Sequence, residues 1–231
     1  ISPVKVVPIP IINRITKSIE LFQNKTDCCG CSACYNVCPR KAISMQEDEY
    51  GYVYPVIDQD KCVGCGLCRK VCHYQADKEL RTPIKAYAAA GKKEEFLKKA
   101  ASGGMFSLVA DKILEEGGVV FGAAMEYHNN TLIPKHIAVE SKEELFKLQG
   151  SKYVQSFIGN TYAEAKKYLA DGRKVLFSGT PCQIEGLKGY LGREYENLYT
   201  IDIICHGVPN PKWFQDYIKV FETKLQGSIY S

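Results

Sequence analysis

The sequence predicts a small α+β unit followed by a larger α/β domain whose central sheet is flanked by helices. Two observations predict this division. Nine of the 11 cysteines fall between Cys28 and Cys72. Beyond a charged, turn-prone stretch at residues 77–83, cysteines are rare, and short apolar runs alternate with segments of helical periodicity. We therefore expect an extended tail at residues 1–24, a cysteine-rich domain at 25–80 and an α/β domain at 81–231.

The cysteine-rich domain contains an internal repeat. The spacing C-x2-C-x2-C-x3-C occurs twice. The copies are Cys28, Cys31, Cys34 and Cys38, and Cys62, Cys65, Cys68 and Cys72. A [4Fe–4S] cluster takes three thiolates from one such loop and a fourth from further away, and in two-cluster ferredoxins the fourth cysteine of each run ligates the other cluster. The repeat predicts an α+β ferredoxin-like module that holds two [4Fe–4S] clusters.

The predicted ligand sets follow from that exchange. One cluster is assigned to Cys28, Cys31, Cys34 and Cys72, and the other to Cys62, Cys65, Cys68 and Cys38. Zinc is the alternative, but a third cysteine two residues after a C-x2-C pair disfavours it. Neither cluster needs Cys29. A proline usually follows the fourth cysteine, and Pro39 follows Cys38 in the first copy. In the second copy His73 stands at that position, and we expect it to alter the turn or donate a hydrogen bond.

Secondary structure is predicted from periodicity and turn residues. Between the two cysteine runs we expect a short helix at residues 42–45 and then a hairpin through Gly51 and residues 55–58. In the second domain we expect strands at residues 86–89, 119–123, 137–139, 175–177 and 199–204. The helices expected there cover residues 105–116, 143–148, 162–169, 183–191 and 212–225.

Composition excludes several classes of protein. The formal charge of +4 counts every thiol as neutral. Two clusters with their thiolates would each add about −2 and bring the total near zero, so nucleic acid is not an expected partner. No run reaches the ~18 apolar residues of a membrane span. Cysteines at metal-ligand spacing favour a reducing compartment, and we expect a cytoplasmic protein.

Two glycine-containing turns of the second domain are candidate cofactor sites. Ser102, Gly103 and Gly104 open a helix whose free N–H groups can face an anion or cofactor, although a plain helix start fits equally. At Gly179 to Gln183 a strand passes through a tight turn into a helix, with Thr180 as N-cap and Pro181 in the first helical position. Cys182 then lies in the first turn, where the helix dipole favours a thiolate or the N–H groups face a phosphate or flavin carbonyl. The alternative is a buried structural cysteine.

A third segment lies at the end of another predicted strand, where α/β sheets bind ligands. Cys205 and His206 are candidates for a redox or proton-transfer pair, with a packed cysteine and a turn histidine as the alternative.

From about Asp27 to Tyr217 the chain resembles the beta subunits of coenzyme F420-reducing hydrogenases and dehydrogenases, whose bacterial members often carry a two-cluster ferredoxin domain in front. The resemblance rests on the eight repeated cysteines and on the segments Ser102–Gly104, Gly150–Ser156, Gly179–Gln183 and Cys205–Pro209. It implies a flavin, usually FAD, facing a deazaflavin, a plastid pigment or another hydride partner. It also implies a second domain that continues beyond Ser231.

The resemblance implies cofactor-binding roles for Ser102, Gly103, Gly104, Ser151, Lys152, Tyr153, Gly179, Thr180, Pro181 and Gln183. Cys182, Cys205, His206 and Lys152 are the catalytic candidates. Lys152 and Tyr153 would stabilise charge on flavin or substrate, although Lys152 equally fits a surface loop. The resulting hypothesis is an iron–sulfur flavoprotein oxidoreductase that connects a two-electron hydride carrier to one-electron clusters.

Two alternatives stay open. In the first, the chain is a relay subunit without hydride chemistry that feeds a separate catalytic protein. In the second, Cys182 and Cys205 form a thiol pair or ligate a third cluster. A redox partner protein or a small hydride carrier is expected in either case, and homo- or hetero-oligomers are compatible with the sequence.

Overall fold

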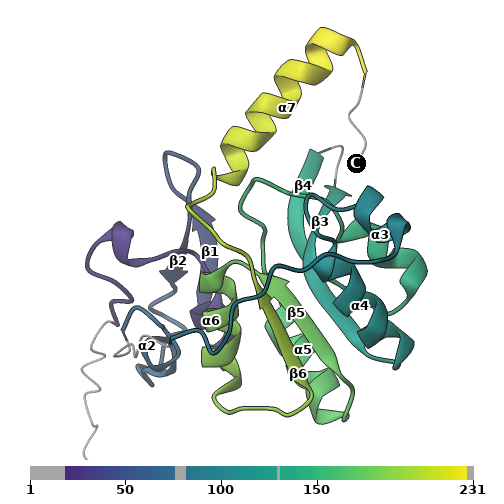
Figure 1. The fold of residues 1–231 in the computed structure, drawn as a ribbon. Helices are drawn as coiled ribbons and strands as arrows, with labels where there is room; N and C mark the ends of the chain where they lie inside the picture. Colours follow the sequence, from purple (N-terminus) through teal and green to yellow (C-terminus); the bar gives the residue numbers. More distant parts are fainter. Residues whose placement is uncertain (1–18, 76–81, 129–130, 228–231) are drawn as a thin grey trace, which may run out of the picture.

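The computed structural model describes residues 19–75, 82–128 and 131–227 (Figure 1). Most of the predicted tail and most of the predicted boundary at residues 77–83 lie outside these residues. The described end of the tail packs against the cysteine-rich module, since Leu21 is buried with Ile43 and Cys68. Among the described residues, no helix is both long and apolar enough to cross a membrane.

The ferredoxin-like module consists of short elements around one hairpin. They are η1 (Lys25–Asp27), α1 (Ala33–Val37), β1 (Ile43–Glu47), β2 (Val53–Ile57) and α2 (Leu67–Lys70). The predicted hairpin is confirmed, with Ile43 opposite Ile57 in the antiparallel pair. The helix expected at residues 42–45 is wrong, because Ile43 is buried as part of β1. A four-residue apolar run is too short to distinguish the two periods.

The second domain is built on a four-stranded mixed sheet with the order β4-β3-β5-β6. The strands are β3 (Val119–His128), β4 (Thr131–Val139), β5 (Val175–Gly179) and β6 (Leu198–Asp202). β4 is antiparallel to β3, whereas β5 and β6 run parallel to it. The expectation of an α/β domain with a central sheet is met.

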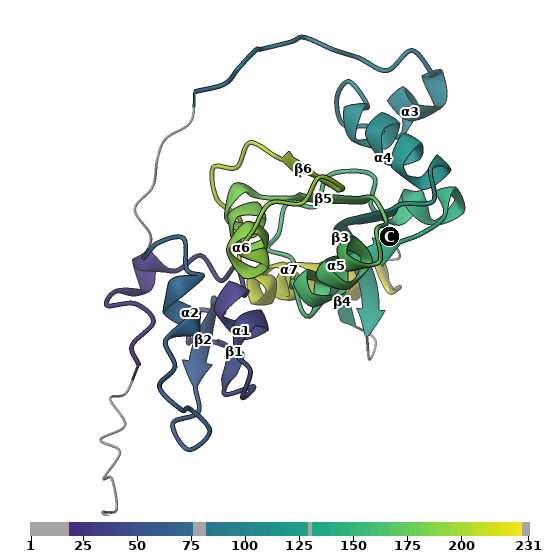
Figure 2. The ribbon, with the colours of Figure 1, turned by 90° about the horizontal axis from the view of Figure 1, so that it is seen from below.

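Helices cover both faces of this sheet (Figure 2). The helices of this domain are α3 (Glu94–Lys98), α4 (Met105–Glu115), η2 (Lys142–Lys147), α5 (Thr161–Ala170), α6 (Pro181–Leu191) and α7 (Pro211–Leu225). Of these, α7 projects away from the sheet (Figure 1) and buries only Pro211. Phe121 and Phe177 face α5 and α6 in one apolar cluster. Val120 and Leu176 face α4 and η2 in another. Successive strand residues point to opposite faces, so continuous apolar runs in β3 and β5 produce a sheet buried on both sides.

Three expected elements differ from the structure. Residues 86–89 are exposed and form no strand. Just after them, Gly91 N donates a hydrogen bond to Gly103 O at 2.7 Å. β4 begins at Thr131, well before residue 137, because its edge position tolerates Pro134. The helix expected at residues 143–148 forms as the 3₁₀ helix η2.

The module docks against α6 of the second domain, and two glycines of α6 allow the approach. A Cβ at Gly186 would lie 3.1 Å from Cys31 Sγ, and one at Gly189 would lie 2.5 Å from Val71 O. The Tyr162 hydroxyl lies 2.9 Å from Cys31 O, and Gln155 Nε2 donates to Cys29 O at 3.1 Å. Hence the first cysteine loop is part of the interface between the domains.

Candidate functional site

The eight repeated cysteines gather into two groups, each around a small cavity. We call Cys28, Cys31, Cys34 and Cys72 the inner set and Cys38, Cys62, Cys65 and Cys68 the outer set. Each group takes its fourth cysteine from the other half of the repeat. This is the grouping that the exchange of fourth cysteines requires.

Backbone N–H groups point at sulfur atoms in both sets. Gly30 N lies 3.5 Å from Cys28 Sγ, and Ala42 N lies 3.3 Å from Cys38 Sγ. Gly30 and Gly64 adopt φ of 67° and 68°, a conformation that glycine reaches without steric cost. Hydrogen bonds to the sulfurs of a cluster stabilise its negative charge, so these loops suit iron–sulfur clusters.

The inner thiols are packed against one another. A hydrogen bond from Cys29 and the neighbouring His73 lower the pKa of Cys31 to about 5 in spite of its burial. Burial, together with the neighbouring thiols Cys31 and Cys72, raises the pKa of Cys28 to about 11. Burial likewise raises the pKa of Cys34. Iron would supply the missing positive charge and deprotonate the thiols, so the donor set fits a cluster.

A cavity of about 660 Å³ lies between the ferredoxin-like module and the second domain. Its wall on the module side includes Cys28, Cys29 and Cys31, and none of the outer set lines it. The second domain contributes the start of α4, the loop after η2, the turn between β5 and α6, the segment after β6 and residues of the sheet. A cavity of this size accommodates a small-molecule cofactor.

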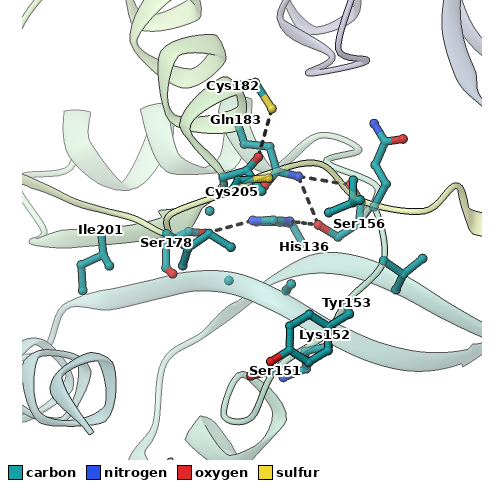
Figure 3. Close-up of a pocket in the computed structure, with 18 of the residues that line it drawn as sticks. His136, Ser151, Lys152, Tyr153, Ser156, Ser178, Cys182, Gln183, Ile201 and Cys205 are labelled. Carbon is teal, nitrogen blue, oxygen red and sulfur yellow. Dashed lines mark hydrogen bonds between the residues drawn. The ribbon is translucent and has the colours of Figure 1, made fainter. Parts of the chain in front are cut away.

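The cavity brings together most of the predicted cofactor residues. Ser102, Gly104, Ser151, Lys152, Tyr153, Gly179, Thr180 and Gln183 line it, as do the catalytic candidates Cys182 and Cys205 (Figure 3). Gly103, Pro181 and His206 are not part of the lining. Gly103 instead packs against the 86–91 segment, where a Cβ would lie 2.4 Å from Ala89 O. His206 is exposed, so the structure does not place it in the cavity beside Cys205.

The turn between β5 and α6 has the predicted local structure. Thr180 is the N-cap and Pro181 the first residue of α6, and Thr180 N donates to Gln183 Oε1 at 3.0 Å. The Cys182 Sγ lies 3.0 Å from Thr180 Oγ1. A hydrogen bond from the Cys29 thiol and one from Thr180 lower the pKa of Cys182. Side-chain hydrogen bonds thus favour the Cys182 thiolate at this helix start.

Cys29 lies beside the inner set and is not an isolated residue. Its sulfur, that of Cys31 and a ring nitrogen of His73 lie within 4.8 Å of one another. Cys29 Sγ is 3.9 Å from His73 Nε2, and His73 Nδ1 is buried without a hydrogen-bond partner. The residue that replaces the usual proline thus faces the inner thiols.

A buried polar chain behind the cavity was not predicted from the sequence. His136 Nε2 lies 3.0 Å from Ser178 O, and His136 Nδ1 lies 2.9 Å from Ser156 Oγ. A carbonyl only accepts, so Nε2 carries the proton and Nδ1 accepts from Ser156. Gln183 Nε2 in turn donates to Ser156 Oγ at 3.1 Å. Burial lowers the pKa of His136 to about 4, which keeps the ring neutral near pH 7.

One sequence signal for His136 existed. Leu132, Pro134 and His136 alternate along β4, and all three are buried. Alternation of apolar and polar residues predicts a half-buried strand. Here the signal was weak because Pro134 disfavours a strand and because apolar Ile133 and polar His136 break the alternation.

Lys152 lines the cavity from the loop after η2. Its Nζ donates to Gln149 O at 2.6 Å and to Lys147 O at 3.1 Å, and burial lowers its pKa to about 8. The neighbouring Tyr153 side chain is 81% exposed. In Figure 3 these two residues lie on the side of the cavity opposite Cys182 and Cys205.

Comparison with known protein families matches three consecutive segments of the chain. Residues 27–76 match the 4Fe-4S dicluster domain. Residues 86–160 match the N-terminal part of the coenzyme F420 hydrogenase/dehydrogenase beta subunit, and residues 172–229 match the C-terminal part of the same subunit. The two beta-subunit segments together span more than half of the chain.

Individual relatives match the chain over shorter or more divergent stretches. A dihydromethanopterin reductase (acceptor) of Methanosarcina mazei is 37% identical over 78 residues, which cover 33% of this chain and 31% of that protein. A coenzyme F420-dependent sulfite reductase of Methanocaldococcus jannaschii is 24% identical over 191 residues, which cover 79% of this chain and 28% of that protein. The chain thus spans less than a third of the length of each.

Among solved structures, a chain from the xenon-derivatised F420-reducing [NiFe] hydrogenase complex of Methanosarcina barkeri matches with a TM-score of 0.46 and 22% identity. The match covers 61% of this chain and 52% of that chain. The family matches follow the same order as the two domains of the structure. The chain belongs to the coenzyme F420 hydrogenase/dehydrogenase beta-subunit family, an oxidoreductase family, and carries a 4Fe-4S dicluster domain in front of it.

Proposed function

We propose that the chain is an iron–sulfur flavoprotein subunit that passes electrons between a hydride carrier in the cavity and two [4Fe–4S] clusters. The inner set would hold one cluster and the outer set the other. FAD would occupy the cavity, and a deazaflavin of the coenzyme F420 type is the hydride carrier that the family suggests. A flavin, when bound, exchanges hydride as two electrons and passes them on singly, whereas each cluster carries one electron.

The observation that carries this proposal is the shared wall between the cavity and the inner set. Cys28, Cys29 and Cys31 line the cavity, and Gly186 of α6 brings Cys31 against the second domain. A cofactor in the cavity would therefore lie beside one cluster. The outer set, absent from the cavity wall, would lie further along the same path.

The residues of the cavity suit a flavin in two ways. Gly104 begins α4 in a left-handed conformation and has no side chain to cap the helix, so the first N–H groups of α4 can receive a phosphate. Ala123, Leu148 and Ile201 provide apolar walls. An apolar cavity with few polar groups is typical of cofactor sites.

Other residues of this chain would hold the geometry and the charge. The turn that carries Cys182 is held by the hydrogen bonds that connect Gln183 to Ser156 and Ser156 to His136. Lys152, which is charged below a pKa of about 8, supplies a cation on the opposite side for a reduced, anionic ring or a phosphate. We assign no proton-transfer role to His136, since burial keeps it neutral.

An anaerobic preparation analysed together for iron, sulfide, zinc and flavin tests the proposal. We expect about eight irons and as many sulfides per chain, with stoichiometric FAD and no zinc. Eight irons without flavin would instead favour a relay subunit that has no hydride chemistry. Zinc at the eight cysteines would contradict both interpretations.

A double substitution tests whether Cys182 and Cys205 ligate iron. In Cys182→Ser with Cys205→Ser, we expect unchanged iron, because the inner and outer sets already provide four sulfurs each. Loss of about four irons would reveal a third cluster and overturn the ligand assignment.

A further inference from the structure

The outer set opens onto the surface of the ferredoxin-like module. Cys65 is exposed, and nothing lies within 4 Å of where a Cβ would stand at Gly64 or Gly66. Two apolar side chains beside these residues are also exposed, Val63 by 48% and Leu67 by 39%. The inner set, in contrast, lies against α6 and faces the cavity between the two domains.

Exposed basic side chains flank the cysteines of the outer set along the chain. We call the exposed residues Arg40, Lys41, Lys61, Arg69 and Lys70 the basic rim. The same two stretches, residues 38–42 and 58–72, contain two acidic residues, Asp58 and Asp60. Five positive and two negative charges exceed the charge of about −2 that a cluster with its thiolates would add.

Three other acidic residues of the module gather at its other end. Glu47, Asp48 and Glu49 lie at the turn of the β1–β2 hairpin, whereas Ile43 and Ile57 pair at the end next to the outer set. Gly51 in that turn lies against Lys212 at the start of α7. The hairpin therefore separates the negative end of the module from the basic rim.

We propose that the basic rim and the apolar centre formed by Val63 and Leu67 are the docking surface for an acidic one-electron carrier protein. This inference rests on the proposed function, in which the outer set holds a cluster. Complementary charge steers the approach and orients the carrier, and a small exposed apolar centre is typical of transient redox contacts. Docking there would serve the transfer of one electron, in which no bond forms or breaks and one partner is oxidised as the other is reduced.

Binding measurements on the anaerobic holoprotein test the surface directly. The probe is flavodoxin, an acidic one-electron carrier, and the opposite probe is cytochrome c, a basic one. We expect flavodoxin to bind, with an affinity that falls steeply as salt rises from about 0.02 M to about 0.3 M. In Arg40→Glu with Lys70→Glu, we expect affinity for flavodoxin to fall by about tenfold or more.

The matched control reverses two exposed lysines on α5, Lys166→Glu with Lys167→Glu, and should change the affinity by less than about twofold. Undiminished flavodoxin binding by the Arg40 and Lys70 variant would overturn the proposal, as would tighter binding of cytochrome c to the unmodified protein. Iron and flavin content, measured on the same samples, separate this failure from failure of the proposed function. The iron and flavin contents test which cofactors the protein holds, whereas the binding data test where the carrier protein docks.

Discussion

The inner and outer cysteine sets come from two copies of one motif but lie in different surroundings. The inner set is covered by α6, lines the large cavity and has Cys29 and His73 as neighbours. The outer set opens to solvent beside Gly64 and Gly66, and exposed basic residues flank its cysteines along the chain. The repeated spacing determines what each loop can bind, and the second domain determines how that group is used.

The most severe test of this comparison removes the exchanged cysteines. Cys72→Ser should empty the inner set, although Cys72 belongs to the second motif copy, and Cys38→Ser should empty the outer set. Each variant should retain about four irons out of about eight, because three thiolates hold a cluster poorly. Iron analysis gives the amount lost, and anomalous scattering at the iron edge locates the cluster that remains. A Cys72→Ser protein that keeps the cluster of the inner set would refute the exchange.

The buried His136, in the hydrogen-bonded group behind the cavity, should make the stability of the protein depend on pH. The pKa of His136 is lowered to about 4 in the folded protein, from an unperturbed 6.5. The unfolded chain therefore takes up the proton first as pH falls. We expect a loss of roughly 3 kcal/mol of stability across the window from pH 6.5 to pH 4, with stability fully present above pH 6.5.

Melting temperatures at pH 7.5 and pH 5.5 measure the upper part of this loss. His136→Gln removes the titrating group and should flatten the dependence, while His128→Gln, on an exposed histidine, should leave it intact. Equal slopes for the two variants would disprove the assignment.

A side chain added to α6 where it contacts the inner set should reduce stability moderately. In Gly186→Ala, the added Cβ would lie 2.8 Å from the Tyr162 hydroxyl and 3.1 Å from Cys31 Sγ. We expect a net destabilisation of about 1–3 kcal/mol, even though alanine favours a helix by about 1 kcal/mol over glycine. Chemical unfolding measures it.

The matched control for this clash is Lys188→Ala on the exposed side of α6, which should change stability by less than about 0.5 kcal/mol. An unaffected Gly186→Ala protein with both clusters intact would show that the inner set does not depend on this contact.

The smallest expected effect concerns Lys152, on the side of the cavity away from the inner set. Its pKa of about 8 means that the ammonium is present below pH 8 and is lost above it. Affinity for FAD should therefore fall by a few-fold, about 1 kcal/mol or less, between pH 7 and pH 9. Fluorescence titration measures this, and Lys152→Arg should abolish the fall because arginine stays charged.

The sequence was most informative where chemistry depends on spacing. Two C-x2-C-x2-C-x3-C runs predicted both the grouping of Cys38 with the second loop and that of Cys72 with the first. The α6 turn was likewise predictable, since Thr180 and Pro181 are strong helix-start signals. Apolar runs of four residues were not, and both residues 42–45 and residues 86–89 were assigned wrongly.

What the sequence could not provide was the contact between distant segments. Gly186 and Gly189 have no local reason to occur within a helix, where glycine is unfavourable. Their reason is the approach of Cys31 and Val71, which lie more than a hundred residues away in the chain. The burial of His136 depends in the same way on Ser156 and Ser178 from other segments.

Anomalous scattering at the iron edge, from crystals of the anaerobically purified protein, tests the central claim most directly. We predict two iron centres, one bonded to Cys28, Cys31, Cys34 and Cys72 beside the cavity, and one bonded to Cys38, Cys62, Cys65 and Cys68 at the surface. Iron bonded to Cys28, Cys31, Cys34 and Cys38 together would contradict the account, as would scattering from zinc alone.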